Sequence, residues 1–537
     1  MNAFKIKYSV DGQVKITEQS NDDIKLIVVQ DNCRTTVTLC AQREIELLEL
    51  KTSYPFKPDK NDLYFFNGYQ SWTDTKEFTV NERGRDVKKL PKFLVNAFAF
   101  DRYGDASFHA YGKHRMHGYD VFYCKGKNDK FILNLNYALC YLLIELDKKQ
   151  KHLNLHYDYN CYHVKDGEQL TVADYYASDS VTDGMAYFDN VFPKKNMPKI
   201  FGYTSWYNYY QNINEQVLLR DLEALDGQFN LFQIDDGYET KVGDWLSVDK
   251  NKFPNGLKPI ADAAHSKGLK AGIWLAPFVA EEKSELFATR KDLFKRTPDG
   301  GFVKCGANWS GFYALDLENG EARDYVKKCL CHYADMGFDF FKLDFLYAVN
   351  LEPTKGKSRS MVAQEAYTFL RECLKDKIIL GCGATVFNCI NNFDYLRVGP
   401  DISLKFDDVW YMRHMHRERI STKVTLQNTV YRSFFNDRLF GNDPDVFLLR
   451  DDNVWLSDAQ KRALLTLNAL FGNVLMTSDN LASYDDKKRK LLNDALELFY
   501  GANVISYTRK GRTIEIVYDL NGNSRTLKYD TEKGVLL

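Results

Sequence analysis

Phe340-Phe341-Lys342-Leu343-Asp344-Phe345 is a short apolar run that leads to a carboxylate, and a second such run leads to Arg397-Val398-Gly399-Pro400-Asp401. Both are typical of buried strands, and a (β/α)8 barrel places its reactive groups at the ends of such strands. Two carboxylates at strand ends can cleave a glycosidic bond. One can protonate the leaving oxygen while the other attacks or stabilises the sugar carbon.

Similar apolar runs recur along the middle of the chain, with helical patterns such as residues 256–265 and 321–336 between them. This alternation predicts a parallel barrel, an α/β fold. The strand candidates are residues 200–206, 231–235, 269–276, 338–344, 378–383, 395–401, 429–434 and 474–477. The interval from the sixth to the last of them is long and irregular.

Two further regions flank the predicted barrel. The early part of the chain has short alternating segments between Asp, Asn, Gly and Lys clusters, which predict an antiparallel β-sandwich. A polar, proline-bearing stretch at residues 192–198 suits a linker. Near the end, an Asn521-Gly522 turn beside strand-like segments predicts further strands. We therefore expect an N-terminal β-sandwich over residues 1–192, a (β/α)8 barrel over 193–485 and a small C-terminal β-domain over 486–537.

The composition restricts the class of partner. Lys plus Arg (72) nearly cancel Asp plus Glu (73), so the charge favours neither nucleic acid nor an anionic membrane. The aromatic share is 14%, and flat rings suit the apolar faces of pyranose rings. We expect a small-molecule or oligosaccharide substrate, and a homo-oligomer is left open. No apolar run reaches about 18 residues, so no membrane span is expected.

The N-terminus and the cysteines indicate the compartment. Residues 1–7 alternate charge with apolarity and lack the apolar core of a signal peptide. The eleven cysteines are scattered, many of them in apolar runs, which favours reduced thiols in a cytoplasmic protein. Cys329 and Cys331 form a close pair beside His332 but lack a second ligand pair at zinc-finger spacing. We expect neither a metal nor a cofactor.

Polar and aromatic side chains gather at the ends of the strand candidates. In chain order they are Trp206, Asp235, Asp236, Trp274, Lys342, Asp344, Cys382, Arg397 and Asp401. Lys342 and Asp344 are two residues apart, so on a strand both point to one face. The ammonium could keep Asp344 ionised there, although a structural ion pair has the same spacing. Gly-Pro-Asp is also an ordinary turn sequence, so Asp401 alone could be a turn residue.

The motifs around these residues include Gly202-Tyr203-Thr204-Ser205-Trp206-Tyr207, Phe232-Gln233-Ile234-Asp235-Asp236-Gly237-Tyr238, Gly243-Asp244-Trp245, Gly272-Ile273-Trp274-Leu275-Ala276-Pro277-Phe278, Tyr313-Ala314-Leu315-Asp316-Leu317 and Leu380-Gly381-Cys382-Gly383. With the two opening motifs, they resemble the catalytic barrel of the family 36 glycoside hydrolases, the bacterial α-galactosidases, which are related to family 27. The resemblance covers residues 199 to about 480. It implies an exo-acting enzyme that removes terminal α-linked galactose with retention and without a cofactor.

The resemblance also implies roles for individual residues. It makes Asp344 the nucleophile and Asp401 the acid/base, and retention needs their carboxyl groups about 5 to 5.5 Å apart. It implies that Asp235 and Asp236 hold the axial O4 and the O6 of a galactose-type ring, while Lys342 bonds a sugar hydroxyl. A magnesium site is the competing interpretation of the aspartate pair, but a third carboxylate at suitable spacing is missing.

Aromatic residues would form the walls of the implied pocket. Trp206 and Trp274 are the wall candidates, and Trp72 is the candidate for a tryptophan that the family places over the pocket mouth. Core packing is the alternative for Trp72. Cys382 would lie near the sugar's 2-position unless it is a small core residue. Arg397 would contact the 2-substituent or act as a structural salt-bridge partner.

Three other functions fit parts of this pattern. An α-N-acetylgalactosaminidase on the same scaffold would differ only in the room around the 2-position. An aldolase-like barrel could use Lys342 in a Schiff base, but the sequence offers no phosphate loop. A non-catalytic sugar binder is the third, and the presence of both aspartates argues against it.

Overall fold

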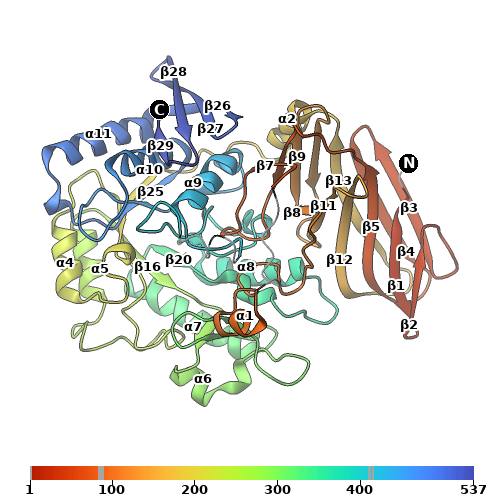
Figure 1. The fold of residues 1–537 in the computed structure, drawn as a ribbon. Coiled ribbons are helices and arrows are strands. Elements are labelled where there is room, and N and C mark those ends of the chain that lie inside the picture. Colours follow the sequence, from red (N-terminus) through yellow and green to blue (C-terminus); the bar gives the residue numbers. More distant parts are fainter. Residues whose placement is uncertain (1–2, 83–89, 409–412, 414–415) are drawn as a thin grey trace.

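The computed structural model describes residues 3–82, 90–408, 413 and 416–537. Two antiparallel sheets come first, a parallel sheet surrounded by helices follows, and a small antiparallel sheet ends the chain (Figure 1). All eleven cysteines lie in the described part of the chain, and none of them forms a disulfide there. Among the same residues, no helix has the length and apolarity needed to cross a bilayer.

The N-terminal region consists of two antiparallel sheets. The first runs in the order β2 (Gln13–Thr17), β1 (Lys5–Val10), β5 (Ile45–Pro55), β12 (His152–Val164), β11 (Leu142–Asp147) and β8 (Arg115–Tyr119). The second runs in the order β3 (Ile24–Asp31), β4 (Arg34–Ala41), β13 (Gln169–Ser178), β10 (Lys130–Asn134), β9 (Val121–Lys125), β6 (Leu63–Phe66) and β7 (Glu77–Thr79). Inward side chains of both sheets, such as Tyr8 and Phe122, belong to one buried apolar cluster. Helix α2 (Val181–Val191) packs against the second sheet, whereas α1 (Lys92–Phe98) lies apart from both sheets, beside the middle region (Figure 1).

The middle region is a parallel sheet that closes on itself. Its order is β23 (Gly441–Asp443), β22 (Tyr395–Arg397), β21 (Ile378–Gly381), β20 (Phe340–Leu343), β16 (Lys270–Leu275), β15 (Leu231–Ile234), β14 (Ile200–Thr204), β25 (Val474–Thr477) and β24 (Val446–Phe447). Only Pro444 and Asp445 separate the edge strands β23 and β24, which pair with β22 and β25 respectively. The connectivity is therefore that of an eight-stranded barrel whose seventh strand is interrupted.

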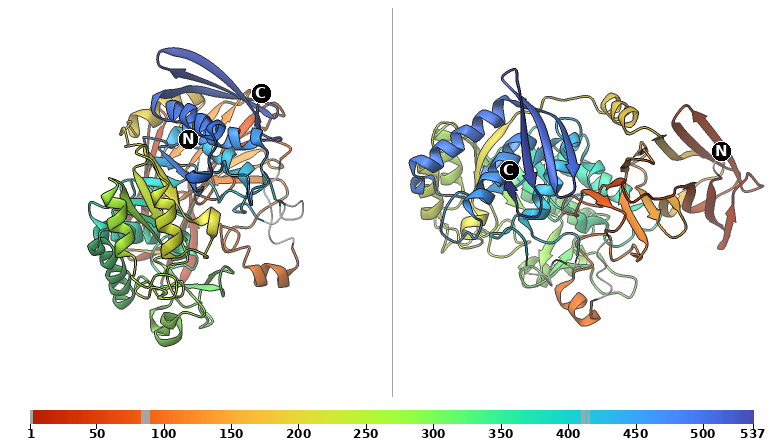
Figure 2. Two further views of the ribbon diagram at one scale, coloured as in Figure 1. Left: turned by 90° about the vertical axis from the view of Figure 1, so that its left-hand side faces the viewer. Right: turned by 45° about the horizontal axis from the view of Figure 1, so that its top comes forward.

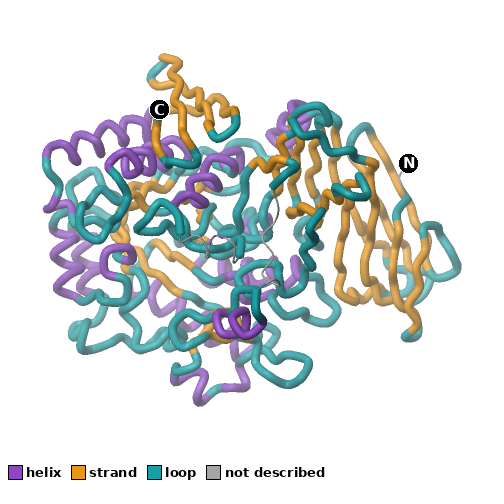
Figure 3. Tube along the Cα trace, viewed as in Figure 1, coloured by secondary structure: helices purple, strands orange, loops and turns teal. Residues whose placement is uncertain are grey.

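Helices surround this sheet (Figure 3). They are α3 (Trp206–Tyr209), α4 (Glu215–Glu223), α5 (Lys258–Ser266), α6 (Glu285–Thr289), α7 (Gly320–Met336), α8 (Arg359–Leu374), α9 (Thr422–Tyr431), α10 (Asp458–Phe471) and α11 (Asp486–Gly501). Short 3-10 turns are η2 (Lys291–Leu293), η3 (Leu346–Asn350), η4 (Phe387–Cys389), η6 (Ser433–Phe435) and η7 (Leu481–Ser483), and β17 (Val279–Glu281), β19 (Phe312–Ala314) and β18 (Lys304–Gly306) form a separate small sheet. Side-chain caps set several helix starts; Ser457, for example, forms a capping box with Gln460 before α10.

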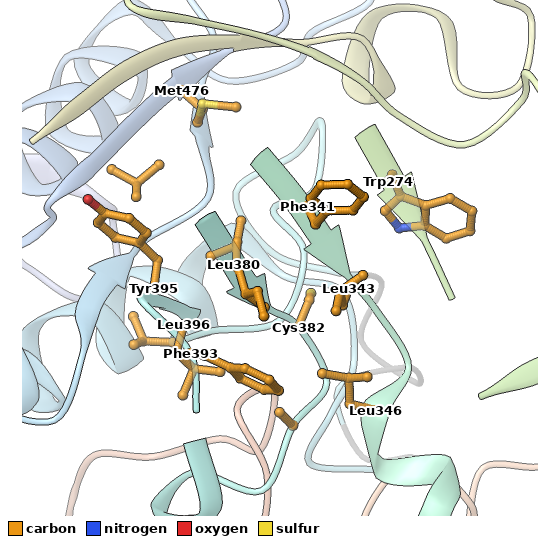
Figure 4. Close-up of a cluster of buried hydrophobic side chains, with 14 of the residues drawn as sticks. Trp274, Phe341, Leu343, Leu346, Leu380, Cys382, Phe393, Tyr395, Leu396 and Met476 are labelled. Atoms are coloured by element: carbon orange, nitrogen blue, oxygen red, sulfur yellow. The ribbon is translucent and has the colours of Figure 1, made fainter. Parts of the chain in front are cut away.

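The central barrel strands are buried on both faces. Phe341, Leu343 and Leu380 belong to one apolar cluster with Trp274 and Met476 (Figure 4). Parallel strands that are covered on both faces have nearly continuous apolar sequences, so the sequence predicts these strands clearly. Polar side chains are consequently displaced to the strand ends.

A four-stranded antiparallel sheet closes the chain. It contains β26 (Ala502–Lys510), β27 (Thr513–Leu520), β28 (Asn523–Asp530) and β29 (Val535–Leu536) and lies beside the last barrel helices (Figure 2). The predicted turn joins β27 to β28, with φ of 55° at Asn521 and 80° at Gly522. The segment expected to be a β-domain over residues 486–537 begins with α11, and its strands start at Ala502.

One strand prediction is wrong. Residues 429–434 end helix α9 and enter η6. Their β-branched and aromatic side chains suit a strand, but α9 is buried except at Lys423, so no polar face marks it as a helix. The actual seventh strand is short: β23 consists of Gly, Asn and Asp, which are depleted in strands, and Pro444 and Asp445 separate it from β24.

Arg432, just after α9, joins the N-terminal sheets to the barrel. Its buried guanidinium donates to Asn67 Oδ1 (3.1 Å) and to the main-chain oxygens of Gln70 (3.2 Å) and Ser71. A further bond of 2.8 Å goes to Val398 O, beside the end of β22. Burial, with the nearby Arg417 charge, lowers the pKa of Arg432 to about 9. This one side chain therefore fixes the turn of residues 67–72 to the barrel.

We expect Arg432→Met to destabilise the protein strongly. The change removes the donors of several buried carbonyl oxygens, and each unsatisfied group costs about 1 to 3 kcal/mol. Thermal unfolding should show a clearly lower Tm and an unfolding free energy reduced by about 3 kcal/mol or more. Arg525→Met, at an exposed position of the C-terminal sheet, is the matched control and should change stability by less than about 0.5 kcal/mol. Equal stability of the two variants would contradict this assignment.

Candidate functional site

The predicted residues converge on one pocket at the carboxyl ends of the barrel strands. The pocket has a volume of about 370 Å³. The predicted residues that line it are Trp72, Trp206, Asp235, Asp236, Trp274, Lys342, Asp344 and Asp401. Arg397 and Cys382 lie behind this lining and contact it.

Asp344 follows β20 directly and is held by two N–H donors. Trp274 Nε1 donates to Oδ2 (3.0 Å) and Phe345 N donates to Oδ1 (2.8 Å). The side chain is buried, with 8% of the residue exposed. Phe345 has a φ of 54°, so the chain turns sharply as it leaves the strand. The turn aims the Asp344 carboxylate into the pocket.

Asp401 lies in the loop after β22, in different surroundings. A third of its side chain, 33%, is exposed, and Arg397 Nη1 donates to its Oδ1 at 3.1 Å. Burial in the pocket raises the pKa of Asp401 above the usual aspartate range. The positive charges of Arg397 and Lys342 oppose this rise, whereas the Asp344 charge adds to it. Asp401 therefore retains a proton at a pH where an ordinary aspartate has lost it.

Lys342 and Asp235 form a buried ion pair. Lys342 Nζ lies 2.8 Å from Asp235 Oδ2, and their side chains are 6% and 2% exposed. The same oxygen accepts from Gln233 Nε2 (2.7 Å) and Thr204 Oγ1 (3.1 Å). Burial alone would lower the pKa of Lys342, but the Asp235 charge raises it above its ordinary value. The structure thus pairs Lys342 on β20 with Asp235, which follows β15, rather than with Asp344, which follows β20 itself.

Asp236 lies at the bend after β15 and faces the same pocket. Gln211 Nε2 donates to both of its oxygens (3.0 and 3.2 Å), and Trp309 Nε1 donates to Oδ2 (2.9 Å). Glu239 is buried beside it, and burial together with the Asp236 charge raises the pKa of Glu239 well above its usual range. Asp236 is therefore positioned by donors on one side and a carboxylic acid on the other.

Trp72 enters the pocket from the N-terminal region. Its Nε1 donates to Cys382 Sγ at 3.3 Å, and its ring meets the Phe345 ring edge-on at 5.2 Å. Gly383 has a φ of 60°, and a Cβ atom there would lie 2.9 Å from the Trp72 ring. Glycine is required at this contact because any side chain would collide with the indole. Cys382 is fully buried beneath Trp72, and this burial raises the pKa of its thiol.

Arg397 lies at the end of β22 among three aspartates. Its Nη1 is 3.1 Å from Asp401, its Nε is 3.0 Å from Asp443, and its Nη2 is 3.0 Å from Asp445. Burial would lower the pKa of Arg397, but the charges of Asp445 and Asp443 raise it well above its usual value. The structure thus shows Arg397 in the salt-bridge arrangement, behind Asp401.

Sequence reasoning missed one wall of the pocket. Phe98, Phe100 and Tyr103 come from the N-terminal region, and His416 and Ile420 from the loop between β22 and α9. Phe100 and Tyr103 both stack on His416, with centroids 5.3 and 5.7 Å away. These residues stand in irregular segments far apart in the sequence, so no strand-end rule could find them.

Part of the sequence is similar to known proteins. Residues 189–373 match the Melibiase family model. Alpha-galactosidase Mel36A of Lactobacillus acidophilus is 31% identical over 149 residues, which is 26% of this chain and 20% of that protein. An alpha-galactosidase of Escherichia coli is 28% identical over 186 residues, or 33% of this chain and 25% of that protein. The matches thus span about a fifth to a quarter of these curated relatives.

A solved structure is similar over almost the whole chain. It is TtGalA, an alpha-galactosidase from Thermus thermophilus in complex with p-nitrophenyl alpha-D-galactopyranoside. The TM-score is 0.72 at 23% sequence identity, and the match covers 97% of this chain and 98% of that one. This likeness supports the barrel architecture described above.

We expect Lys342→Met to destabilise the protein more than the double variant Lys342→Met/Asp235→Asn. The single change leaves Asp235 charged and buried, and breaking such a pair costs about 3 to 5 kcal/mol. Neutralising Asp235 as well removes the unpaired charge, so part of the stability should return. Chemical unfolding of both single variants, the double variant and the wild type gives the coupling energy. Additive effects would argue against a tight ion pair.

Proposed function

We propose that this protein is a retaining α-galactosidase of glycoside hydrolase family 36, in the clan shared with family 27. It would remove terminal α-D-galactosyl residues from oligosaccharides or glycoconjugates. The observation that carries the proposal is that Asp344 and Asp401 line one pocket in unlike environments. A double displacement needs such an asymmetry, since one carboxyl must attack while the other holds a proton.

In the first step, Asp344 attacks the anomeric carbon from the β face. Trp274 and Phe345 hold its two oxygens, which limits the carboxylate to a narrow range of orientations. Asp401 donates its proton to the departing glycosidic oxygen, so the aglycone leaves as a neutral alcohol. The sugar remains bound as a β-galactosyl ester of Asp344.

In the second step, water resolves this ester. Asp401, now a carboxylate, accepts a proton from water as the water oxygen attacks the anomeric carbon. The ester bond to Asp344 breaks, α-galactose is released, and both carboxyl groups return to their starting states. Two inversions give net retention.

The floor of the pocket suits the hydroxyl groups of the sugar. Lys342 offers a charged donor, and Asp235 and Asp236 offer acceptors, at the end of the pocket formed by β15 and β20. Trp206 and Trp274 offer flat apolar faces to the ring. The two relatives and the solved structure described above are alpha-galactosidases, and this supports galactose as the sugar. We further propose that residues 1–192 form a sandwich that supplies Trp72, that 193–485 form the catalytic barrel, and that 486–537 form a C-terminal domain.

Azide rescue separates the roles of the two aspartates. In Asp344→Ala, azide can occupy the vacated space and attack the substrate once, which should give β-galactosyl azide. In Asp401→Ala, Asp344 still forms the β-ester and azide attacks that ester, which should give α-galactosyl azide. Turnover of p-nitrophenyl α-galactoside should fall by about 10³-fold or more in Asp344→Ala without azide. The anomer is read by NMR, and the same anomer from both variants would refute the assignment.

Sugar selectivity tests the space near the 2-position. Trp72 covers Cys382, the residue expected there, so a 2-acetamido group would find little room. We expect kcat/KM for p-nitrophenyl α-galactoside to exceed that for the N-acetylgalactosaminide by roughly 100-fold or more. Parallel assays of the two glycosides measure this ratio. A preference for the N-acetylated substrate would replace the proposed activity with that of an α-N-acetylgalactosaminidase.

A further inference from the structure

The interruption of the seventh barrel strand places an acidic side chain behind the pocket. Pro444 and Asp445 separate β23 from β24, and Asp445 has a φ of 74°. A non-glycine residue in this region is strained and persists only where its surroundings hold it. Asp445 is fully buried, with 0% of the residue exposed. The break in the strand thus costs backbone strain at Asp445 and places its carboxylate in the protein interior.

The contacts of Asp445 lead to both sides of the pocket. Its Oδ2 accepts from Ile402 N at 2.8 Å and from the Tyr207 hydroxyl. Ile402 directly follows Asp401, and Tyr207 directly follows the lining residue Trp206. The Asp445 carboxylate therefore ties the loop that bears Asp401 to the segment after β14.

The same carboxylate competes with Asp401 for one cation. Arg397 Nη2 lies 3.0 Å from Asp445 Oδ1, while Nη1 of the same guanidinium lies 3.1 Å from Asp401. Burial, together with the charges of Asp401 and Asp443, raises the pKa of Asp445 to about 6. The Arg397 charge and the hydrogen bond from the Tyr207 hydroxyl oppose this rise. When Asp445 is ionised, its negative charge partly neutralises Arg397, so Arg397 stabilises the Asp401 carboxylate less.

We propose that Asp445 is a positioning residue that holds the Asp401 loop through Ile402 and, through Arg397, keeps Asp401 protonated for proton donation to the leaving group. This inference rests on the proposed function, because it assigns Asp445 a part in the acid/base step. Asp445 does not belong to the residues that line the pocket. The interrupted strand is the device that brings its carboxylate to Arg397.

Asp445→Asn tests this through the pH profile. The amide keeps the shape of the side chain but removes its charge, so Arg397 acts more fully on Asp401 and lowers the pKa of Asp401. For methyl α-galactoside, whose leaving group needs a proton, the basic limb of kcat/KM should move to lower pH by about one unit. At any pH on the basic limb, the activity should then fall roughly tenfold. For 2,4-dinitrophenyl α-galactoside, which needs no proton, kcat/KM should change less than about threefold.

Asp479→Asn is the matched control. Asp479 is equally buried, pairs with Arg450 at 2.9 Å, and accepts from two backbone N–H groups and from the Tyr484 hydroxyl. It has the same kinds of partner as Asp445 but does not contact Arg397 or the Asp401 loop among the bonds of the described residues. We expect this variant to lose stability without moving the basic limb.

The outcomes separate the inference from the proposed function. A basic limb in Asp445→Asn that matches the wild type, or a loss equal for both substrates, overturns the role of Asp445. A wild type that hydrolyses neither galactoside overturns the proposed function instead. If Asp445→Asn does not fold, Tyr207→Phe replaces it. Loss of that hydroxyl favours protonated Asp445, so the limb should move in the same direction by a smaller amount, and an unmoved limb refutes the inference.

Discussion

Two buried cations, Lys342 and Arg397, set the arrangement of this site. A buried ammonium or guanidinium is tolerated only where carboxylates compensate its charge, since the desolvation of an unpaired ion costs several kcal/mol. In each case a partner comes from a different strand of the barrel. Asp235 at the end of β15 neutralises Lys342 on β20, and Asp443 at the end of β23 neutralises Arg397 on β22. The ion pairs therefore link the ends of adjacent strands, β22 and β23, and of strands one apart, β15 and β20.

The barrel alone does not complete the pocket. Trp72 and the stack of Phe100 and Tyr103 on His416 bring N-terminal side chains to its edge. Hydrogen bonds from Arg432 and the pairing of Ser71 N with Ala384 O (2.8 Å) hold that edge in place. Because these bonds are buried, loss of any one leaves unsatisfied groups rather than exposing them to water. The N-terminal sheets are thus part of the site as well as neighbours of the barrel.

The fold was predictable where burial and sequence pattern agree. Strands β20 and β21 are buried on both faces and mostly apolar, so the sequence predicts them clearly. The carboxylates after β15, β20 and β22 are predicted together because parallel strands end at one edge of the sheet. Helix α9 is not predicted by the sequence pattern because it is buried nearly all round, so it lacks the polar face that identifies a helix.

The strands β23 and β24 are not predicted for the opposite reason. The Gly, Asn and Asp of β23 suit a turn, and only their pairing with β22 makes them a strand.

The partner of Lys342 shows a second limit. Spacing along one strand placed Lys342 and Asp344 on a common face, which is correct, since both line the pocket. It could not show that Asp235 on another strand comes within 2.8 Å of the ammonium. That distance depends on how β15 and β20 are staggered on either side of β16, and stagger is a property of the closed barrel. Asp344 is consequently left to the N–H groups of Trp274 and Phe345, neutral donors that orient a carboxylate without an ion pair.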